Sequence, residues 1–563
     1  MVVIHVCVHY IQCSMQDFVS KQYNLDLVLI PTHSKMRETM SEEQKDTTVP
    51  LFKPYNQNQQ MLLPPDLNEL IPRNHLVRVV SKTIDAMNIK PLIESYKGGG
   101  SPSYAPKMLL KLWIYGYISQ VYTCRKLHKA LLENVYFMWL AGQNRPDFRT
   151  LQNFRLRLKS SIEEIFASLL SHLIDLGYIK LEHYFVDGTK MVADANKYSY
   201  VWKKNTERYS AQVQEKIREL LKQIDDANTA EDQEYGNKDL DEMGEDSQIS
   251  SDRLQKIAQE LDRKLDKDSA EKKELSKAKG KIERDYLPRL KKYEQQKQNL
   301  GERNSFSKTD KDATFFRFKN DEVLPAYNIL AGTENQFFLN WSIHQHPTDT
   351  VSFIPHMDKL STLTSQKPKI AVGDSGFGSE ENYNYLHQNG IDNFLKYNTF
   401  HRDLEGKLPK NPFDKAYFTY DEETNCYICP QGRRLLFKET QESETDNDYL
   451  IKYDVFQCTD CSGCPNAADC KKTEGKRTVR RRQTLDMYRR QAFDNLTSFE
   501  GVKLRKQRNI DVESVFGHIK HNLGIRRFKM RGLGKVNIEM GLICIAHNIK
   551  KMFNQSMVSL QPA

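Results

Sequence analysis

The chain has 563 residues, of which 39% are hydrophobic and 28% charged, and its formal net charge is +9. This length and composition predict several soluble globular domains, and no stretch is apolar over the length needed to span a bilayer. The charge is concentrated between Lys471 and Lys551, where 21 Lys and Arg stand against 7 Asp and Glu. Such a local excess favours a polyanion partner, most often nucleic acid, with a merely solubilising surface as the alternative.

Residues 1–50 read as an uncertain leader followed by a polar arm. The opening "MVVIHVCVHYIQC" is apolar, but it lacks the basic leader and small-residue cleavage site of a secretory signal. Its composition differs from that of the neighbouring polar residues, so Met36 or Met40 is an alternative start. We therefore expect a cytoplasmic protein, in which thiols stay reduced.

Residues 51–180 predict a helical DNA-binding domain. Long apolar periodicities, including "MLLKLWIYGYISQVY", are separated by Pro and Gly clusters at "GGGSPSYAP" and "GQNRPDFRT". In "RPDFRTLQNFR" we predict Thr150 as the N-cap of a helix that carries Arg155 and Arg157. With Arg149, this basic helix could enter a DNA groove, and an ordinary bundle helix is the alternative.

Strand-like runs separated by a Gly turn follow in "LEHYFVDGTKMVADANKYSYVW". Residues 203–304 are rich in Glu, Lys, Asp and Gln and predict a long helical hairpin that breaks at 229–248. Strand signals resume at "PAYNILAGTENQFFLNWSIHQH", where His344 and His346 could form a metal pair, although hydrogen-bonding roles are favoured. Asp310 and Asp312 are interpreted as loop residues. "KPKIAVGDSGFGSEENYNYLHQNGIDNFLKY" predicts strand, Gly-rich loop, helix and strand.

Three acids stand at positions suited to metal-dependent phosphoryl chemistry. Asp187 ends the apolar run "YFV", and Asp374 ends "IAV" before a Gly-rich loop. Acids at the ends of neighbouring strands, joined by one on a packed helix, can hold two divalent cations about 4 Å apart. Glu513 fits the third position: it begins "DVESVFGHIKHNLGIRRFKMRG", a basic stretch in which Glu513, Lys520 and Arg527 recur at about helical spacing. A solvated amphipathic helix is the alternative.

Six of the ten cysteines cluster in residues 426–470. Repeated Cys-x2-Cys spacing in a reducing compartment favours structural zinc. One zinc takes four thiolates, so the pairing stays open. Cys426 and Cys429 could join two of the later four, which is the favoured form, or the later four could close a site alone. The later four are Cys458, Cys461, Cys464 and Cys470, and the isolated thiols, expected to be unpaired, are Cys7, Cys13, Cys124 and Cys544.

Several motifs together resemble one family. "DGTK", "GDSGFGS" and Glu513-x6-Lys520, with "PYNQNQQMLLPPDLNELIPRNHLVRVV" and "VESVFGHIKHNLGIRRFKMRGLGKV", resemble bacterial insertion-sequence DDE transposases. The resemblance is close to the group whose prototype is the insertion sequence numbered eleven eighty-two. It implies an α/β RNase H-like core at 181–425 and 471–553. An all-α N-terminal domain precedes the core, a helical hairpin insertion and a cysteine-rich insertion interrupt it, and a tail, 554–563, follows.

The resemblance implies roles for individual residues. Asp187, Asp374 and Glu513 would form the catalytic triad and hold two Mg²⁺ or Mn²⁺ ions. The family signature Tyr-x2-Arg-x3-Glu-x6-Lys is matched at Glu513 and Lys520, whereas Lys506 and Asn509 replace its Tyr and Arg, which makes Arg508 the candidate arginine. The expected DNA-binding residues are Arg508, Lys520, His521, Arg526, Arg527, Arg531, Arg149 and Arg155.

The predicted function is binding of terminal inverted repeats, DNA cleavage and strand transfer, with self-association in a synaptic complex. A catalytically inactive, zinc-containing DNA-binding regulator derived from a transposase is the alternative. A nuclease that cuts without joining is a third interpretation.

Overall fold

The computed structural model describes residues 66–96, 102–235, 249–265, 272–445, 447–471 and 475–559. These residues fall within one compact unit, Asp66–Ala563. The predictions for the leader, the arm, Cys7 and Cys13 lie outside the described residues, as does most of the predicted break at 229–248.

The N-terminal region is helical, as predicted. Its α4 is buried nearly all round, with Leu110, Trp113 and Tyr117 fully buried, as expected of a core helix. The N-cap prediction for α7 was wrong: Asp147, not Thr150, is the cap, because its carboxylate accepts the Thr150 N–H at 2.7 Å. The helices are α2 (Leu76–Ala86), α3 (Lys90–Glu94), α4 (Pro106–Ile118), α5 (Cys124–Glu133), α6 (Val135–Leu140), α7 (Phe148–Arg157) and α8 (Ile162–Asp175).

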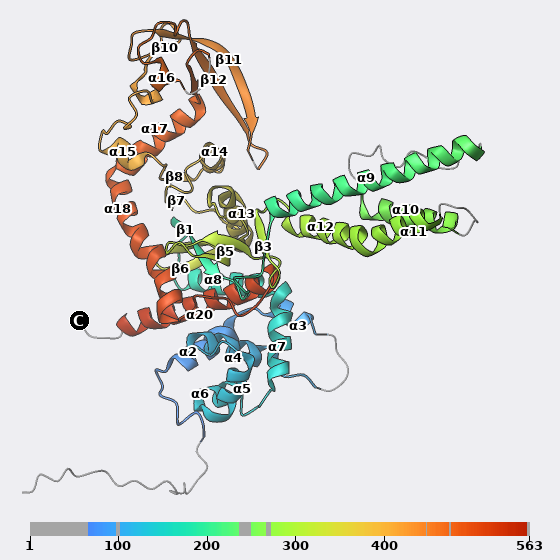
Figure 1. Cartoon of the computed structure of the whole chain (residues 1–563). Helices are drawn as coiled ribbons and strands as arrows, with labels where there is room; N and C mark the ends of the chain where they lie inside the picture. The colour runs from blue at the N-terminus through green and yellow to red at the C-terminus, as the bar shows by residue number, and fades with distance from the viewer. Residues whose placement is uncertain are drawn as a thin grey trace, which may run out of the picture. The chain divides into compact units, whose positions relative to one another are not determined.

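A mixed sheet follows, in the order β6-β5-β1-β7-β8 (Figure 1). β5 is antiparallel to β1 and β6, whereas β7 is parallel to both β1 and β8. The short β4 continues the β6 edge of β5. The strands are β1 (His183–Val192), β4 (Thr314–Arg317), β5 (Val323–Glu334), β6 (Phe337–His344), β7 (Ile370–Gly373) and β8 (Asp392–Leu395), with the helices α13 (Phe353–Thr364) after β6 and α14 (Glu380–Gln388) after β7.

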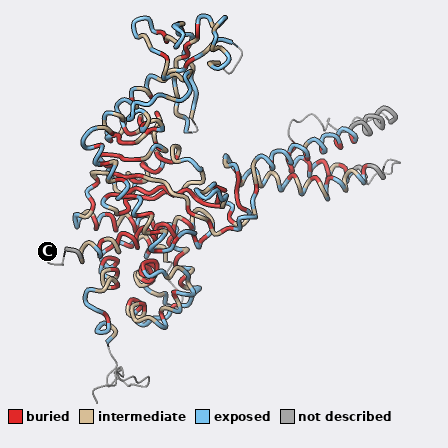
Figure 2. Tube along the Cα trace, turned by 60° about the vertical axis from the view of Figure 1, so that its left-hand side comes forward, coloured by how far each residue is buried: buried red, intermediate tan, exposed pale blue. Residues whose placement is uncertain are grey.

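The N-terminal helices and the sheet share one hydrophobic core, whose buried residues are shown in red in Figure 2. The last helix, α20 (Leu533–Ser559), makes this connection because it packs against β6, α4 and α8. A Cβ on Gly541 would lie 2.4 Å from Ile162 and 3.0 Å from Trp341, so the helix approaches both closely. Trp341 also meets Phe166 edge to face, with ring centroids 4.8 Å apart.

The described residues between 203 and 304 are mostly helical. This segment begins and ends at the strand pair β2 (Tyr200–Trp202) and β3 (Ser305–Ser307). Its helices are α9 (Lys203–Tyr235), α10 (Ser251–Leu265), α11 (Lys272–Lys281), the π-turn η2 (Ile282–Tyr286) and α12 (Leu287–Leu300). Their apolar faces, including Val213, Ile257 and Leu290, pack into a small core of their own.

The cysteine-rich segment belongs to a larger antiparallel sheet than expected. Its order is β13-β12-β11-β10-β9, and it extends beyond 426–470 on both sides. The strands are β9 (Thr419–Asp421), β10 (Cys426–Ile428), β11 (Arg434–Glu444), β12 (Leu450–Cys458) and β13 (Thr478–Arg481), with the short helices α15 (Phe400–Leu404) before them and α16 (Ala467–Cys470) after β12. Its own core contains Phe418, Tyr427 and Phe456.

Candidate active site

Strand register places Asp187 beside Asp374. β1 pairs with β7 up to Phe185 opposite Val372, and two further residues along each strand bring the two acids level. Because residues two apart on a strand face the same side, both carboxylates lie on one face at the end of β7. Asp374 directly follows β7, as predicted.

The predicted strand end at Asp187 was wrong. β1 continues to Val192, and Gly188 pairs with Leu330 of β5, so no Gly turn interrupts the strand. What ends near Asp187 is the neighbouring strand β7. Asp187 is therefore at the edge of the parallel part of the sheet, although it lies in the middle of its own strand.

Glu513 reaches the same place on a helix that follows α17 (Gln483–Thr497). The helical elements α18 (Phe499–Arg508), η5 (Asn509–Glu513), α19 (Ser514–Gly517) and η6 (His518–Asn522) succeed one another without a break, and η5 and η6 are π-helical turns. The buried Asp511 carboxylate accepts the Gln336 N–H of the β5–β6 turn at 2.8 Å, which fixes η5 on the sheet. Helix ends at Asn522, so Arg527 lies beyond it and does not share the predicted helical face.

Arg508 joins all three acids. Its Nη2 lies 3.0 Å from Asp187 Oδ1 and 3.9 Å from Asp374 Oδ2, and its Nη1 lies 3.9 Å from Glu513 Oε1. The residue is only 6% exposed. The prediction that Arg508 contacts DNA phosphate therefore needs correction, because its guanidinium is buried among carboxylates. The three acids, spread over more than 300 residues of sequence, converge on one cation.

A fourth acid, Asp349, lies beside this group and was missed in the sequence. It precedes the 3-10 turn η3 (Thr350–Ser352), and Asn328 of β5 donates its amide N–H to Asp349 Oδ1 at 2.7 Å. A Cβ on Gly188 would lie 2.6 Å from that oxygen, so a larger residue there would displace the Asp349 carboxylate. The available signal was weak: Asp349 follows strand β6 after a Pro-containing loop.

Burial, with repulsion between neighbouring carboxylates, disfavours the charged forms of Asp187 and Asp349. Burial raises the pKa of Asp187 to about 6; the Arg508 guanidinium opposes this rise, and Asp374 and Asp349 add to it. Burial also raises the pKa of Asp349, which the Asn328 hydrogen bond opposes. Carboxyl groups in this state gain most from a bound cation.

Asp187, Asp349 and Glu513 open into a groove of about 980 Å³. Lys520 lines it, and its ammonium donates to Thr189 Oγ1 and to the Lys190 carbonyl. Burial lowers the pKa of Lys520. Further cationic side chains, Lys190, Arg317, Lys319 and Arg526, line the groove together with His521 and give it a phosphate-compatible rim.

The other predicted DNA-binding residues differ in accessibility. Arg155 is 5% exposed and stacks over Trp113 at 4.5 Å, so the prediction that it contacts DNA was wrong. Arg149 is exposed. Arg527 and Arg531 both pair with Asp194, at 3.1 and 2.9 Å, and keep about half of their side-chain surface exposed.

His344 and Asp310 serve hydrogen bonding. His344 Nε2 lies 2.6 Å from Ser342 Oγ, which also contacts His356. The buried Asp310 accepts from the Tyr327 hydroxyl at 2.9 Å, and Asp312 accepts from the Leu533 N–H at 2.8 Å. These contacts agree with the favoured interpretation of His344 and with loop roles for both acids.

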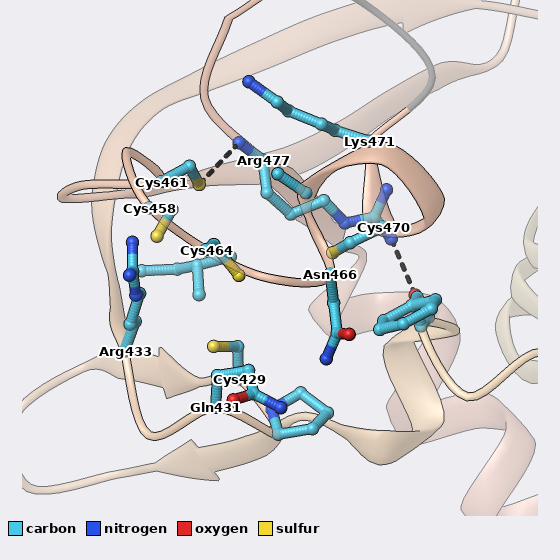
Figure 3. A pocket seen from close by; sticks show the side chains of 14 residues that line it. Cys429, Gln431, Arg433, Cys458, Cys461, Cys464, Asn466, Cys470, Lys471 and Arg477 are labelled. Atoms are coloured by element: carbon cyan, nitrogen blue, oxygen red, sulfur yellow. Dashed lines mark hydrogen bonds between the residues drawn. The ribbon is translucent and has the colours of Figure 1, made fainter.

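Five of the six clustered cysteines surround one small cavity of about 30 Å³ (Figure 3). They are Cys429, Cys458, Cys461, Cys464 and Cys470. Cys426 does not line the cavity; its thiol contacts Thr424 at 3.1 Å. Successive residues of β10 face opposite sides, so Cys426 faces away from Tyr427, which belongs to the core beside the other thiols. The favoured pairing of Cys426 with Cys429 is therefore not supported by the geometry.

Cationic side chains and one backbone amide lie beside the thiols. Arg433, Lys471 and Arg477 line the same cavity, and the Arg477 N–H donates to Cys461 Sγ at 3.4 Å. Burial raises the pKa of Cys458 to about 11 and raises that of Cys470. All cysteines in the described part of the chain have free thiols.

Within the described ranges, no three Asp, Glu, His or Cys side chains stand close enough together to hold a metal ion as they are. At the acidic group, the Arg508 guanidinium stands between the carboxylates. Among the same residues, no helix has the length and apolar character needed to cross a membrane.

Two segments of the chain match known protein families. Residues 428–553 match a transposase DDE domain, and residues 65–157 match a transposase domain designated DUF772. The first match includes Glu513, Lys520 and five of the clustered cysteines, whereas Asp187 and Asp374 lie outside it. No curated protein and no solved structure matches the chain. These two segments of the chain are therefore similar to transposase domains, the C-terminal one to a DDE domain.

Proposed function

We propose that this chain is a DDE transposase that binds the terminal inverted repeats of its element, cleaves DNA there and transfers the freed strand. The observation that carries the proposal is the convergence of Asp187, Asp374 and Glu513 on the Arg508 guanidinium. Acids from a central strand, from the end of its parallel neighbour and from a packed helix would together supply the ligands for two-metal phosphoryl transfer.

The donor set fits divalent cations. Carboxylate oxygens are the ligands that Mg²⁺ and Mn²⁺ prefer, and these acids already share one buried cation. Metal ions held by Asp187, Asp374 and Glu513 would activate water or a 3′-hydroxyl and stabilise the leaving oxygen of the phosphodiester. The role of Arg508 is to neutralise these acids when no metal is bound.

DNA would lie along the groove beside Glu513. Lys190, Lys319 and Arg526 line this groove, so backbone phosphates would meet cations beside the acids. Lys520 is more deeply placed and would orient the scissile phosphate from beside Asp187. Self-association in a synaptic complex remains part of the proposal, by resemblance to the family.

The test is a cleavage assay on duplex DNA that carries the two flanks of the gene, with Mn²⁺. Asp187→Asn should lose cleavage and retain DNA binding, because binding depends on phosphate contacts. Glu322→Gln is the matched control, since Glu322 is an exposed acid in the same groove, and it should cleave normally. Sequence-specific binding without cleavage by the unaltered protein would favour the inactive regulator, and cleavage that is never followed by joining would favour a nuclease.

We also propose a structural zinc held by Cys429 and three of Cys458, Cys461, Cys464 and Cys470. A four-thiolate zinc carries two net negative charges, which Arg433, Lys471 and Arg477 would balance. Such a site would stabilise a module whose core is small.

Metal analysis tests this assignment. The purified protein should hold about one zinc per chain, Cys461→Ser should release it, and Cys426→Ser should keep it. Zinc below about half an equivalent in the unaltered protein, or loss of zinc in both variants, would contradict the proposed ligand set.

A further inference from the structure

We propose that Asp349 is a fourth carboxylate of the cation site, held toward Asp187 and Asp374 by Asn328. This inference rests on the proposed function and extends it to a residue that neither the sequence motifs nor the family matches assign. The cations it would help to hold are Mg²⁺ or Mn²⁺.

Close approaches at two glycines locate the Asp349 carboxylate. The position of a Cβ on Gly188, the residue after Asp187, lies within 2.8 Å of both Asp349 oxygens. The position of a Cβ on Gly376 lies 3.1 Å from Asp374 Oδ1 and 3.6 Å from Asp349 Oδ2. Asp349 is therefore packed between the segments that carry the two strand acids.

The surrounding contacts leave one oxygen of Asp349 available. Asn328 occupies Oδ1 at 2.7 Å, while Oδ2 accepts no hydrogen bond from the described residues. The loop itself is anchored, because Thr350 donates its hydroxyl to the Gly376 carbonyl at 2.7 Å and Asn382 donates to the Thr350 carbonyl at 3.0 Å. A carboxylate fixed in this way, facing the groove, is preorganised as a ligand.

A buried cation already points into this group of acids. Arg508 is 6% exposed, and its Nε has no partner among the residues that the structure describes. One guanidinium thus faces three carboxylates, with Asp349 adding a fourth that it does not contact. Lys520 and Lys190 also lie close enough to act on Asp187 and Asp349, so the ligands left for a divalent ion are the carboxylate oxygens that no partner occupies, among them Asp349 Oδ2.

The test measures Mn²⁺ binding by calorimetry on the full chain without DNA. Asp349→Asn keeps an oxygen for Asn328 and removes the charge. It should weaken Mn²⁺ affinity at least about tenfold while leaving the melting temperature in EDTA close to that of the unaltered protein. Gly188→Ala, whose methyl group would push the Asp349 carboxylate aside, should weaken affinity in the same direction. Glu322→Gln should bind Mn²⁺ normally.

The outcomes separate this inference from the proposed function. Normal Mn²⁺ affinity in Asp349→Asn, together with lost affinity in Asp187→Asn, would overturn the role of Asp349 and leave the three-acid site standing. Absence of Mn²⁺ binding by the unaltered protein would overturn the proposed metal chemistry itself. If Asp349→Asn lowered the melting temperature in EDTA as well as the Mn²⁺ affinity, Asp349 would have a structural role only.

Discussion

Arg508→Met should destabilise the metal-free protein strongly and the metal-bound protein little. The contact with Asp187, at 3.0 Å, joins side chains that are 7% and 16% exposed, and breaking such a buried pair costs about 3 kcal/mol. The contacts with Asp374 and Glu513, at 3.9 Å, involve carboxylates that are 40% and 59% exposed, so each adds only about 0–1 kcal/mol. The expected total of about 3–5 kcal/mol corresponds, for a compact unit as long as Asp66–Ala563, to a melting temperature lower by roughly 3–5 °C.

Two conditions should reduce the loss of stability in Arg508→Met. Mn²⁺ at about 100 times its Kd adds about 2.7 kcal/mol to a protein that binds it only when folded, and it replaces the missing positive charge. Lower pH should also help, because Arg508 holds down the pKa of Asp187, and without Arg508 this carboxyl takes up a proton more readily. The loss should therefore be larger at about pH 8 than at about pH 6.

The assay is thermal melting in EDTA and in Mn²⁺, followed by fluorescence of the fully buried Trp113 and Trp341. Arg526→Met is the control, because Arg526 is exposed and pairs with no acid within the described ranges. The reasoning would be refuted if Mn²⁺ did not reduce the drop in melting temperature caused by Arg508→Met. It would also be refuted if that drop were no larger than the drop caused by Arg526→Met.

Two further predictions concern DNA binding and pH. Arg526→Ala should reduce the salt slope of DNA binding by about one, whereas the buried Arg155→Ala should lower the melting temperature and leave that slope unchanged; equal slopes for both variants would contradict the assignment. Burial raises the pKa of Glu539 from 4.5 to about 7. Because the folded chain holds this proton more tightly, the stabilisation is present below about pH 4.5 and is lost as pH rises through about 7. Glu539→Gln should therefore flatten the decline in melting temperature between about pH 5 and pH 8, and an unchanged decline would contradict this origin.

The sequence was informative where local pattern and chemistry agree. The apolar run "MLLKLWIYGYI" predicted the buried helix α4, and "IAV" before a Gly-rich loop predicted β7 with Asp374 at its end. Asp187 shows the limit of this reasoning. Its strand continues past it, because β5 supplies a partner on one side after β7 has ended on the other. The local sequence around Asp187 does not reveal which distant strands pair with β1, so it could not predict where β1 ends.

Long-range contacts explain the other points at which the structure differs from the sequence-based predictions. Arg155 and Arg508 carry the same charge and were assigned the same role, yet both are buried, one against Trp113 and the other among three acids. Asp349 belongs to no motif and is brought to the site by the loop that crosses from β6 toward β7. Cys426 fits the Cys-x2-Cys spacing, but strand alternation turns it away from the other thiols.

The central claim is that Asp187, Asp374 and Glu513 surround one metal site, and iron-directed cleavage of the unaltered protein tests it most directly. Fe²⁺ would replace Mg²⁺, and hydroxyl radicals generated at the ion would cut the backbone near it. We predict cuts near residues 187, 349, 374 and 513, which lie far apart in the sequence, and we predict that excess Mg²⁺ suppresses all of them together. Cuts confined to the cysteine-rich module, or cuts near one acid that Mg²⁺ does not suppress, would contradict a shared metal site.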